Sequence, residues 1–137
     1  MPHTHMMMLA AQQPPKAAVV LVVEDDDLVR LMTVDYLESC GYLVLEADNA
    51  AKARAWFERQ AIDLMFTDVQ MPGDMDGIAL AEWARANHPT VPVIVTSGVA
   101  SELARYAAGL MMAKPYDLDA VHARIQAALG KRILPSG

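Results

Sequence analysis

Five short apolar runs alternate along the chain with longer segments whose apolar residues recur every three or four positions. Continuous β-branched runs such as residues 19–23 are typical of parallel strands covered on both faces, and the longer segments are typical of amphipathic helices. The predicted strands cover residues 19–23, 42–46, 62–67, 93–96 and 110–113. Five helices are predicted between and after these strands. The first is capped by Asp26 or Asp27 and ends near Ser39, and the second is capped by Asp48 or Asn49 and ends near Arg59. The third is opened by Asp76 and Gly77 and ends near residue 87, a short fourth covers residues 101–108, and the fifth is capped by Asp117 and ended by Gly130.

Five successive strand–helix repeats predict an α/β fold, because each helix must pack its apolar face on a central sheet. Right-handed crossovers restrict the possible topologies. We therefore expect a flavodoxin-like, doubly wound parallel sheet with strand order 2-1-3-4-5. Such a sheet binds its ligand at the carboxyl ends of strands one and three, where the strand order reverses.

Length and composition fit one domain over residues 17–130, with a flexible N-terminal tail over residues 1–16 and a short C-terminal tail over residues 131–137. Apolar residues make up 54% of the chain, but no run reaches the length of a membrane span, so we expect no membrane association. Cys40 is the only cysteine, which excludes an internal disulfide and fits the reducing cytoplasm. The net charge of −6 and the scattered basic residues predict no direct contact with nucleic acid.

Acidic residues follow the two strands that flank the predicted ligand site. Glu24 and Asp25 end the first strand, and Asp68 ends the third. Three carboxylates at one place repel one another, and a divalent cation with a preference for oxygen ligands would relieve that repulsion. We predict a Mg²⁺ site with Asp25 and Asp68 as direct ligands, Glu24 as a ligand through water, and the backbone carbonyl of Gln70 as a further ligand.

A hydroxyl and an ammonium group follow the next two strands. Thr96 ends the fourth strand and Lys114 follows the fifth, so both side chains can reach the same edge of the sheet. Acids, metal, cation and hydroxyl at one edge suit phosphoryl transfer to an aspartate, because the cations and the hydroxyl stabilise charge on the transferring oxygens. In this interpretation Asp68 is the nucleophile.

Five motifs occur in order at the predicted strand ends or in the loops that follow them. They are Val22-Val23-Glu24-Asp25, Thr67-Asp68-Val69-Gln70-Met71-Pro72, Asp76-Gly77, Val95-Thr96-Ser97-Gly98 and Lys114-Pro115-Tyr116. Together they resemble the CheY-like receiver domain of two-component response regulators, and the resemblance covers residues 17–130.

The resemblance implies a role for each of these site residues. Asp68 would accept a phosphoryl group from a phosphohistidine on a histidine kinase or a histidine phosphotransfer protein. Glu24 and Asp25 would hold Mg²⁺, and Thr96 and Lys114 would bind the phosphoryl oxygens. The resemblance also implies a cis peptide bond between Lys114 and Pro115. The phosphorylated domain would then act on a downstream protein in the cytoplasm, and the chain would catalyse only its own phosphorylation and dephosphorylation.

Three features depart from the commonest pattern of that family. The loop from Met71 to Gly77 is one residue longer, and the segment between Thr96 and Lys114 is shorter. Met111 stands where many receivers have tyrosine or phenylalanine. We therefore expect the aromatic relay used by many receivers to be absent from this position.

Two other functions compete with a phosphoacceptor switch that has no output domain in this chain. The first is a Mg²⁺-dependent phosphatase that forms an aspartyl-phosphate, but such enzymes usually carry an acid two residues after the nucleophile, where this chain has Gln70. The second is a protein-binding pseudo-receiver that is never phosphorylated. The complete set Glu24, Asp25, Asp68, Thr96 and Lys114 argues against this second alternative.

Overall fold

The computed structural model describes residues 16–98 and 111–133. Its strands are β1 (Val19–Val23), β2 (Leu43–Ala47), β3 (Leu64–Asp68), β4 (Val93–Ser97) and β5 (Met111–Ala113). Its helices are α2 (Asp27–Ser39), α3 (Ala50–Arg59), α4 (Gly77–Asn87) and α6 (Leu118–Ile133). None of these helices is both long and apolar enough to cross a membrane.

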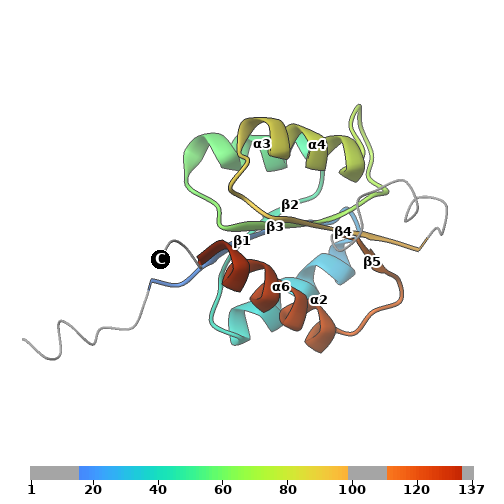
Figure 1. Cartoon of the computed structure of the whole chain (residues 1–137). Coiled ribbons are helices and arrows are strands. Elements are labelled where there is room, and N and C mark those ends of the chain that lie inside the picture. The colour runs from blue at the N-terminus through green and yellow to red at the C-terminus, as the bar shows by residue number, and fades with distance from the viewer. Residues whose placement is uncertain (1–15, 99–110, 134–137) are drawn as a thin grey trace, which may run out of the picture.

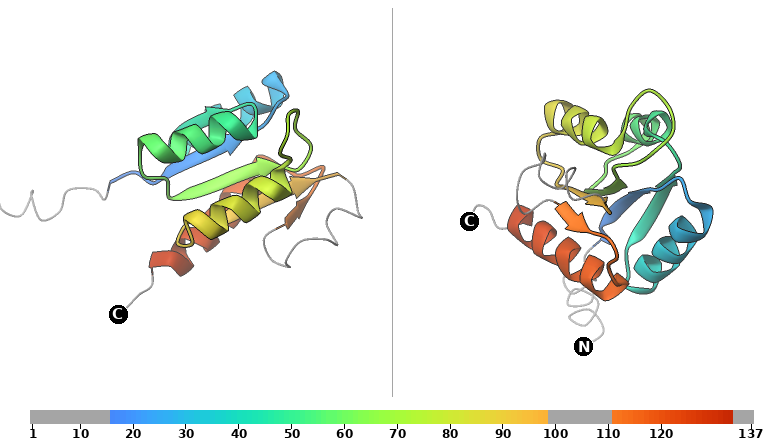
Figure 2. Two further views of the ribbon diagram at one scale, coloured as in Figure 1. Left: turned by 90° about the horizontal axis from the view of Figure 1, so that it is seen from above. Right: turned by 90° about the vertical axis from the view of Figure 1, so that its right-hand side faces the viewer.

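The five strands form one parallel sheet in the order β2-β1-β3-β4-β5, which confirms the predicted topology. Helices α3 and α4 cover one face of the sheet, and α2 and α6 cover the other (Figures 1 and 2). The strand order reverses between β1 and β3, so the carboxyl ends of these two neighbouring strands border the crevice expected of such a sheet.

Successive residues of β1 alternate between the two halves of the core. Val19, Leu21 and Val23 pack with residues of α3 and α4, whereas Val20 and Val22 pack with residues of α2 and α6. All five are buried, as the continuous β-branched run predicts for a central strand. This alternation follows from the two-residue period of a strand.

Side-chain caps begin four helices at the predicted positions. In each case the side-chain oxygen of the capping residue accepts a hydrogen bond from a backbone N–H three residues later. The caps are Asp26, Asn49, Asp76 and Asp117, which accept from Val29, Lys52, Ala79 and Ala120. The structure thus selects Asp26 over Asp27 and Asn49 over Asp48. Gly41 follows α2 with a φ of 101°, which confirms its predicted role in ending that helix.

The prediction that Gly130 ends the last helix is wrong. Helix α6 continues through Gly130 to Ile133, and glycine is tolerated within a helix at a cost of about 1 kcal/mol relative to alanine. The start of the third strand also differs from the prediction. Asp63 accepts a hydrogen bond from the Val19 N–H through its side chain (2.7 Å), and regular pairing begins only at Leu64.

Some predictions fall on residues that the structure does not describe. The short helix predicted over residues 101–108 lies outside the described residues, as do residues 1–15 of the predicted N-terminal tail. The division of the chain into a domain over residues 17–130 and two tails stays a prediction.

Candidate functional site

The sheet brings the predicted site residues to one edge. Asp68 is the last residue of β3 and pairs in register with Thr96 on β4. Glu24 follows β1, and its backbone N–H donates to the carbonyl of Ala47 (3.0 Å). Lys114 follows β5, and its backbone N–H donates to the Ser97 carbonyl (2.9 Å). Backbone hydrogen bonds therefore fix the points from which these functional side chains extend.

The three predicted acids form one cluster. Glu24, Asp25 and Asp68 each offer a carboxylate oxygen, and these oxygens lie within 4.8 Å of one another. Glu24 is 6% exposed and Asp68 is 7% exposed, whereas Asp25 is open to solvent. The cluster thus combines two buried carboxylates with a third that a ligand from the solvent can reach.

Lys114 is the cation of the cluster. Its Nζ lies 3.1 Å from Asp68 Oδ2 and 3.9 Å from Glu24 Oε1. Three ionised carboxylates and one ammonium leave a local charge of −3 + 1 = −2. One divalent cation would neutralise this charge, and carboxylate oxygens are the ligands that Mg²⁺ prefers. The side chains present therefore fit a Mg²⁺ ion held by Glu24, Asp25 and Asp68.

Burial changes the acidity of Glu24. Its pKa is raised from the ordinary 4.5 to about 7, chiefly because burial penalises the charged form. The Asp26 N–H, which donates to Glu24 Oε2 (3.1 Å), opposes this rise in pKa, and so does Lys114. The negative charge of Asp68 and a hydrogen bond with Asp25 raise the pKa further. A bound cation would favour the charged form of Glu24, so metal binding and proton release are coupled at this site.

Thr96 lies beside Asp68 in the sheet, and only 1% of its surface is exposed. Burial, followed by the negative charges of Glu24 and Asp68, raises the pKa of the nearby Tyr116 phenol to about 12, and the Thr96 side chain opposes this rise. Gln70 lies two residues beyond the end of β3 and is exposed. The role of its carbonyl as a metal ligand stays a prediction. The peptide bond between Lys114 and Pro115 is cis, as the resemblance implied.

Gly77 packs helix α4 directly on the backbone of Asp68. Its N–H donates to the Val69 carbonyl (2.8 Å). A Cβ atom on Gly77 would lie 1.9 Å from the Asp68 carbonyl oxygen and 2.8 Å from the Val69 Cα. Because only a residue without a side chain fits here, Gly77 fixes the start of α4 against the residue that ends β3.

Arg30 is a supporting residue that the sequence analysis missed. Its Nη1 donates to the backbone carbonyl of Glu24 (2.8 Å), and its Nε donates to Glu46 Oε1 (3.1 Å). Its Nη2 donates to Asp27 Oδ1 (2.7 Å). One guanidinium thus ties α2 to the residues that end β1 and β2. The sequence position of Arg30 could have indicated this role. Arg30 lies one helical turn after the Asp26 cap, and that spacing directs its side chain back toward the loop that precedes α2.

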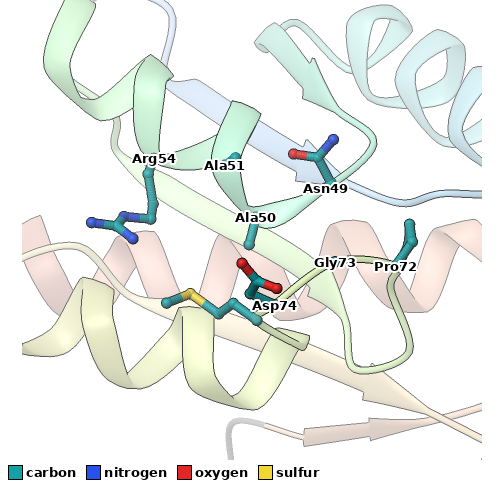
Figure 3. Close-up of a pocket in the computed structure, with 8 residues that line it drawn as sticks. Asn49, Ala50, Ala51, Arg54, Pro72, Gly73 and Asp74 are labelled. Carbon is teal, nitrogen blue, oxygen red and sulfur yellow. The ribbon is translucent and has the colours of Figure 1, made fainter.

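A hollow of about 440 Å³ lies between the first turns of α3 and the loop that follows β3 (Figure 3). Arg54 extends from α3, and Asp74 from the loop. The residues that line the hollow are Asn49, Ala50, Ala51, Arg54, Pro72, Gly73, Asp74 and Met75. None of the clustered acids is among them, so this hollow is separate from the predicted site. Its outer wall is the loop that is one residue longer than the commonest family pattern.

Chemically, the edge of the sheet offers a nucleophile and the means to stabilise negative charge near it. The nucleophile is the buried carboxylate of Asp68, and Lys114 and Thr96 supply a positive charge and a hydroxyl. An electrophile that carries negative oxygens, such as a phosphoryl group, would be stabilised by these groups and by a cation in the acid cluster.

Comparisons with known proteins agree with this geometry. The sequence profile of the family described as the response regulator receiver domain matches residues 20–126. The DNA-binding transcriptional regulator NtrC of Escherichia coli is 29% identical over 98 residues, which cover 68% of this chain and 21% of NtrC. The transcriptional regulatory protein ZraR of the same species is 32% identical over 98 residues, which cover 68% of this chain and 22% of ZraR. The chain spans about a fifth of the length of these relatives.

Solved structures show the same similarity. The receiver domain of the hybrid histidine kinase CckA shares 36% identity with a TM-score of 0.69, and the match covers 82% of this chain and 99% of that one. A response regulator receiver protein from Sinorhizobium medicae shares 26% identity with a TM-score of 0.79, over 87% of this chain and 99% of the other.

Proposed function

Because the chain belongs to the response regulator receiver domain family, we propose that it is a phosphorylation switch in two-component signalling and that Asp68 accepts the phosphoryl group. The observation that carries the proposal is the environment of Asp68. Its buried carboxylate belongs to a cluster of three acids that fits a divalent cation, and the Lys114 ammonium lies 3.1 Å away.

The transfer begins with a phosphohistidine on a histidine kinase or a histidine phosphotransfer protein. An oxygen of Asp68 attacks phosphorus, so a P–O bond forms while the P–N bond breaks and the electron pair leaves with the imidazole. Lys114 then pairs with a phosphoryl oxygen, and the Thr96 hydroxyl donates to another. Mg²⁺, when held by Glu24, Asp25 and Asp68, would neutralise charge on the transferring group. We propose that the chain acts on no separate substrate and catalyses only its own phosphorylation and dephosphorylation.

The surface next to the site supports a protein as the phosphoryl donor. Leu28, Leu31 and Met32 are 65%, 55% and 55% exposed, and their spacing places them together on one face of α2. Met32 also borders a mostly apolar hollow of about 440 Å³, which is lined by Val29, Met32, Thr33, Lys114, Pro115, Tyr116 and Leu118. Since Lys114 borders both this hollow and Asp68, a helical donor protein packed on α2 could present its phosphohistidine to Asp68.

The signal leaves through another protein or domain. The matched segment makes up only about a fifth of each of these relatives, so the receiver unit is one part of each of them. We propose that phosphorylation of Asp68 changes how this unit binds a downstream protein in the cytoplasm, without direct contact with nucleic acid.

The experiment that tests the proposal is chemical phosphorylation followed by mass mapping. We expect phosphoramidate or acetyl phosphate in Mg²⁺ to add one phosphoryl group on Asp68 and none to the Asp68→Asn variant. Asp74→Asn is the matched control, because Asp74 is an exposed carboxylate in the loop after β3 and lies outside the acid cluster. Equal labelling of wild type and Asp68→Asn would contradict the assignment. Steady hydrolysis of small phosphate esters would favour a phosphatase instead.

A further inference from the structure

Helix α2 carries an apolar face that points away from the core. In residues 16–98 and 111–133, the large apolar side chains that are exposed are Leu28, Val29, Leu31, Met32 and Leu43. Leu28, Leu31 and Met32 follow one another at helical spacing, opposite the buried side of α2. Met32 also borders the mostly apolar hollow of about 440 Å³, which Pro115 and Leu118 line as well. We call these three α2 side chains and the hollow the α2 face.

We propose that the α2 face is covered by an apolar segment of this same chain, residues 6–9, which must leave before another protein binds there. The segment consists of Met6, Met7, Met8 and Leu9. The contact itself does not depend on phosphorylation. Its consequence, competition with a protein that donates the phosphoryl group, rests on the proposed function, which places that donor on the same face.

The segment is long enough to reach the α2 face. The Leu43 N–H donates to the Ala18 carbonyl (3.0 Å), so the chain enters the fold beside the start of β2. Helix α2 ends shortly before β2, at the same end of the molecule (Figure 1).

The distances can be compared in numbers. At 1.5 Å per residue, Met32 and Leu28 lie about 11 Å and about 17 Å from Ser39 at the end of α2, and passing around the helix adds about 10–12 Å. Residues 6–8 precede Lys16 by eight to ten residues, which span at most about 26–36 Å when extended. The path to the face is therefore within the length of the chain.

Charge favours this segment over a second copy of the chain. The exposed acids on α2 and in the loop before it are Asp25, Asp26, Asp27, Asp35 and Glu38. Arg30, the one basic residue of α2, is paired with Asp27 and Glu46. Two copies packed α2 against α2 would bring these acids together, and like charges repel. Residues 1–16 contain two histidines and a lysine but no acid, so their approach meets no such repulsion.

Methionine suits a contact of this kind, because its flexible, unbranched side chain fills irregular apolar surfaces. The segment is tethered, so its effective concentration at the face is on the order of millimolar, and a weak intrinsic affinity is enough to keep the face covered. If the face were covered about nine-tenths of the time, the apparent Kd of a protein that binds there would rise about tenfold.

The test is NMR of the methyl groups in the full, unphosphorylated chain. We expect nuclear Overhauser effects from the Met7 methyl group to those of Leu28 or Leu31. In the double variant Met7→Gln with Met8→Gln these effects should disappear, and the Met32 methyl signal should shift because its surroundings become solvent. A separate peptide of residues 1–16, added at several millimolar, should return the Met32 signal of the double variant toward its wild-type position.

Gln12→Ser with Gln13→Ser is the matched control, because it changes two residues outside the apolar segment and should leave the Met32 signal in place. Met75 packs with the half of the core that α3 and α4 cover, so its signal should not move in either double variant. An unmoved Met32 signal and no effects from Met7 would show that the face is open, and would overturn the inference. A Met32 signal that moves with protein concentration would place a second copy on the face and overturn it as well.

These signals do not require Asp68 to accept a phosphoryl group. Failure of the wild-type protein to label on Asp68 would therefore overturn the proposed function and the competition with a donor, while the contact between residues 6–9 and the α2 face is decided by the NMR result alone.

Discussion

The contact between Gly77 and Asp68 makes Gly77→Ala a sensitive test of how the site is built. The alanine Cβ would lie 1.9 Å from the Asp68 carbonyl oxygen, 2.7 Å from the carbonyl carbon and 2.8 Å from the Val69 Cα. Close contacts between carbon and a carbonyl oxygen are about 3.3 Å, so α4 and Asp68 must separate by roughly 1.4 Å. All three obstructing atoms belong to the backbone, and none can rotate away as a flexible side chain would.

The expected cost follows from two terms. Overpacking a tight contact costs about 1–3 kcal/mol, and the hydrogen bond from the Gly77 N–H to the Val69 carbonyl (2.8 Å), which the shift would break, is worth about 1 kcal/mol more. We expect a loss of about 2–4 kcal/mol and a fall in the melting temperature of roughly 10 °C for a domain of this size. Phosphorylation should slow as well, because the shift displaces the backbone that carries the nucleophile.

Gly130→Ala is the matched control. Gly130 lies within α6, and a Cβ there would meet nothing within 4 Å. Alanine is a better helix former than glycine, so we expect this variant to match or exceed wild-type stability. Both variants would be followed by circular dichroism during heating and by phosphoramidate labelling. A Gly77→Ala variant that melts within about 2 °C of wild type and labels normally would refute this account of Gly77.

Three further predictions concern the charges around the acids. Millimolar Mg²⁺ should raise the melting temperature of the wild-type protein, and the rise should shrink in Asp25→Ala, because the ion binds only the folded cluster. Without metal, the free energy of unfolding should fall by up to roughly 3 kcal/mol between about pH 5 and pH 8, because the pKa of Glu24 is about 7 in the folded protein and near 4.5 in the unfolded chain. Denaturant titrations at several pH values would measure this fall, and the Glu24→Gln variant should lack it. Arg30→Met should weaken stabilisation by Mg²⁺, because the Glu24 carbonyl loses its guanidinium partner, whereas Arg59→Met should not.

The sequence was sufficient to predict the sheet, because its signals are local and agree with one another. Continuous apolar runs identify parallel strands, and capping residues such as Asp26 and Asn49 act within three positions of themselves. Gly130 shows the limit of such signals. Glycine often follows a helix, but the packing of α6 on the sheet, with Val121, Ile125 and Leu129 buried, outweighs a propensity cost of about 1 kcal/mol.

The principal site residues were predictable for a related reason. In a parallel sheet the carboxyl ends of all strands meet at one edge, so Glu24, Asp68, Thr96 and Lys114 could be placed together before any distance was known. The supporting residues could not be found in this way. The bond from Arg30 to the Glu24 carbonyl depends on how α2 packs on β1, and the ring contact between Tyr116 and Phe66 joins the loop after β5 to β3.

Met111 and Tyr116 lie in opposite halves of the core. Met111 pairs with Val95, and it packs with the half that α3 and α4 cover. Tyr116 packs with the half that α2 and α6 cover, where its ring lies edge-on against Phe66 (5.9 Å between ring centroids). The aromatic side chain near the acid cluster therefore follows Lys114 and does not precede it, and it lines the apolar hollow beside α2. Because we place the donor protein on that surface, a bound donor would cover Tyr116, whereas Met111 would stay on the other side of the sheet.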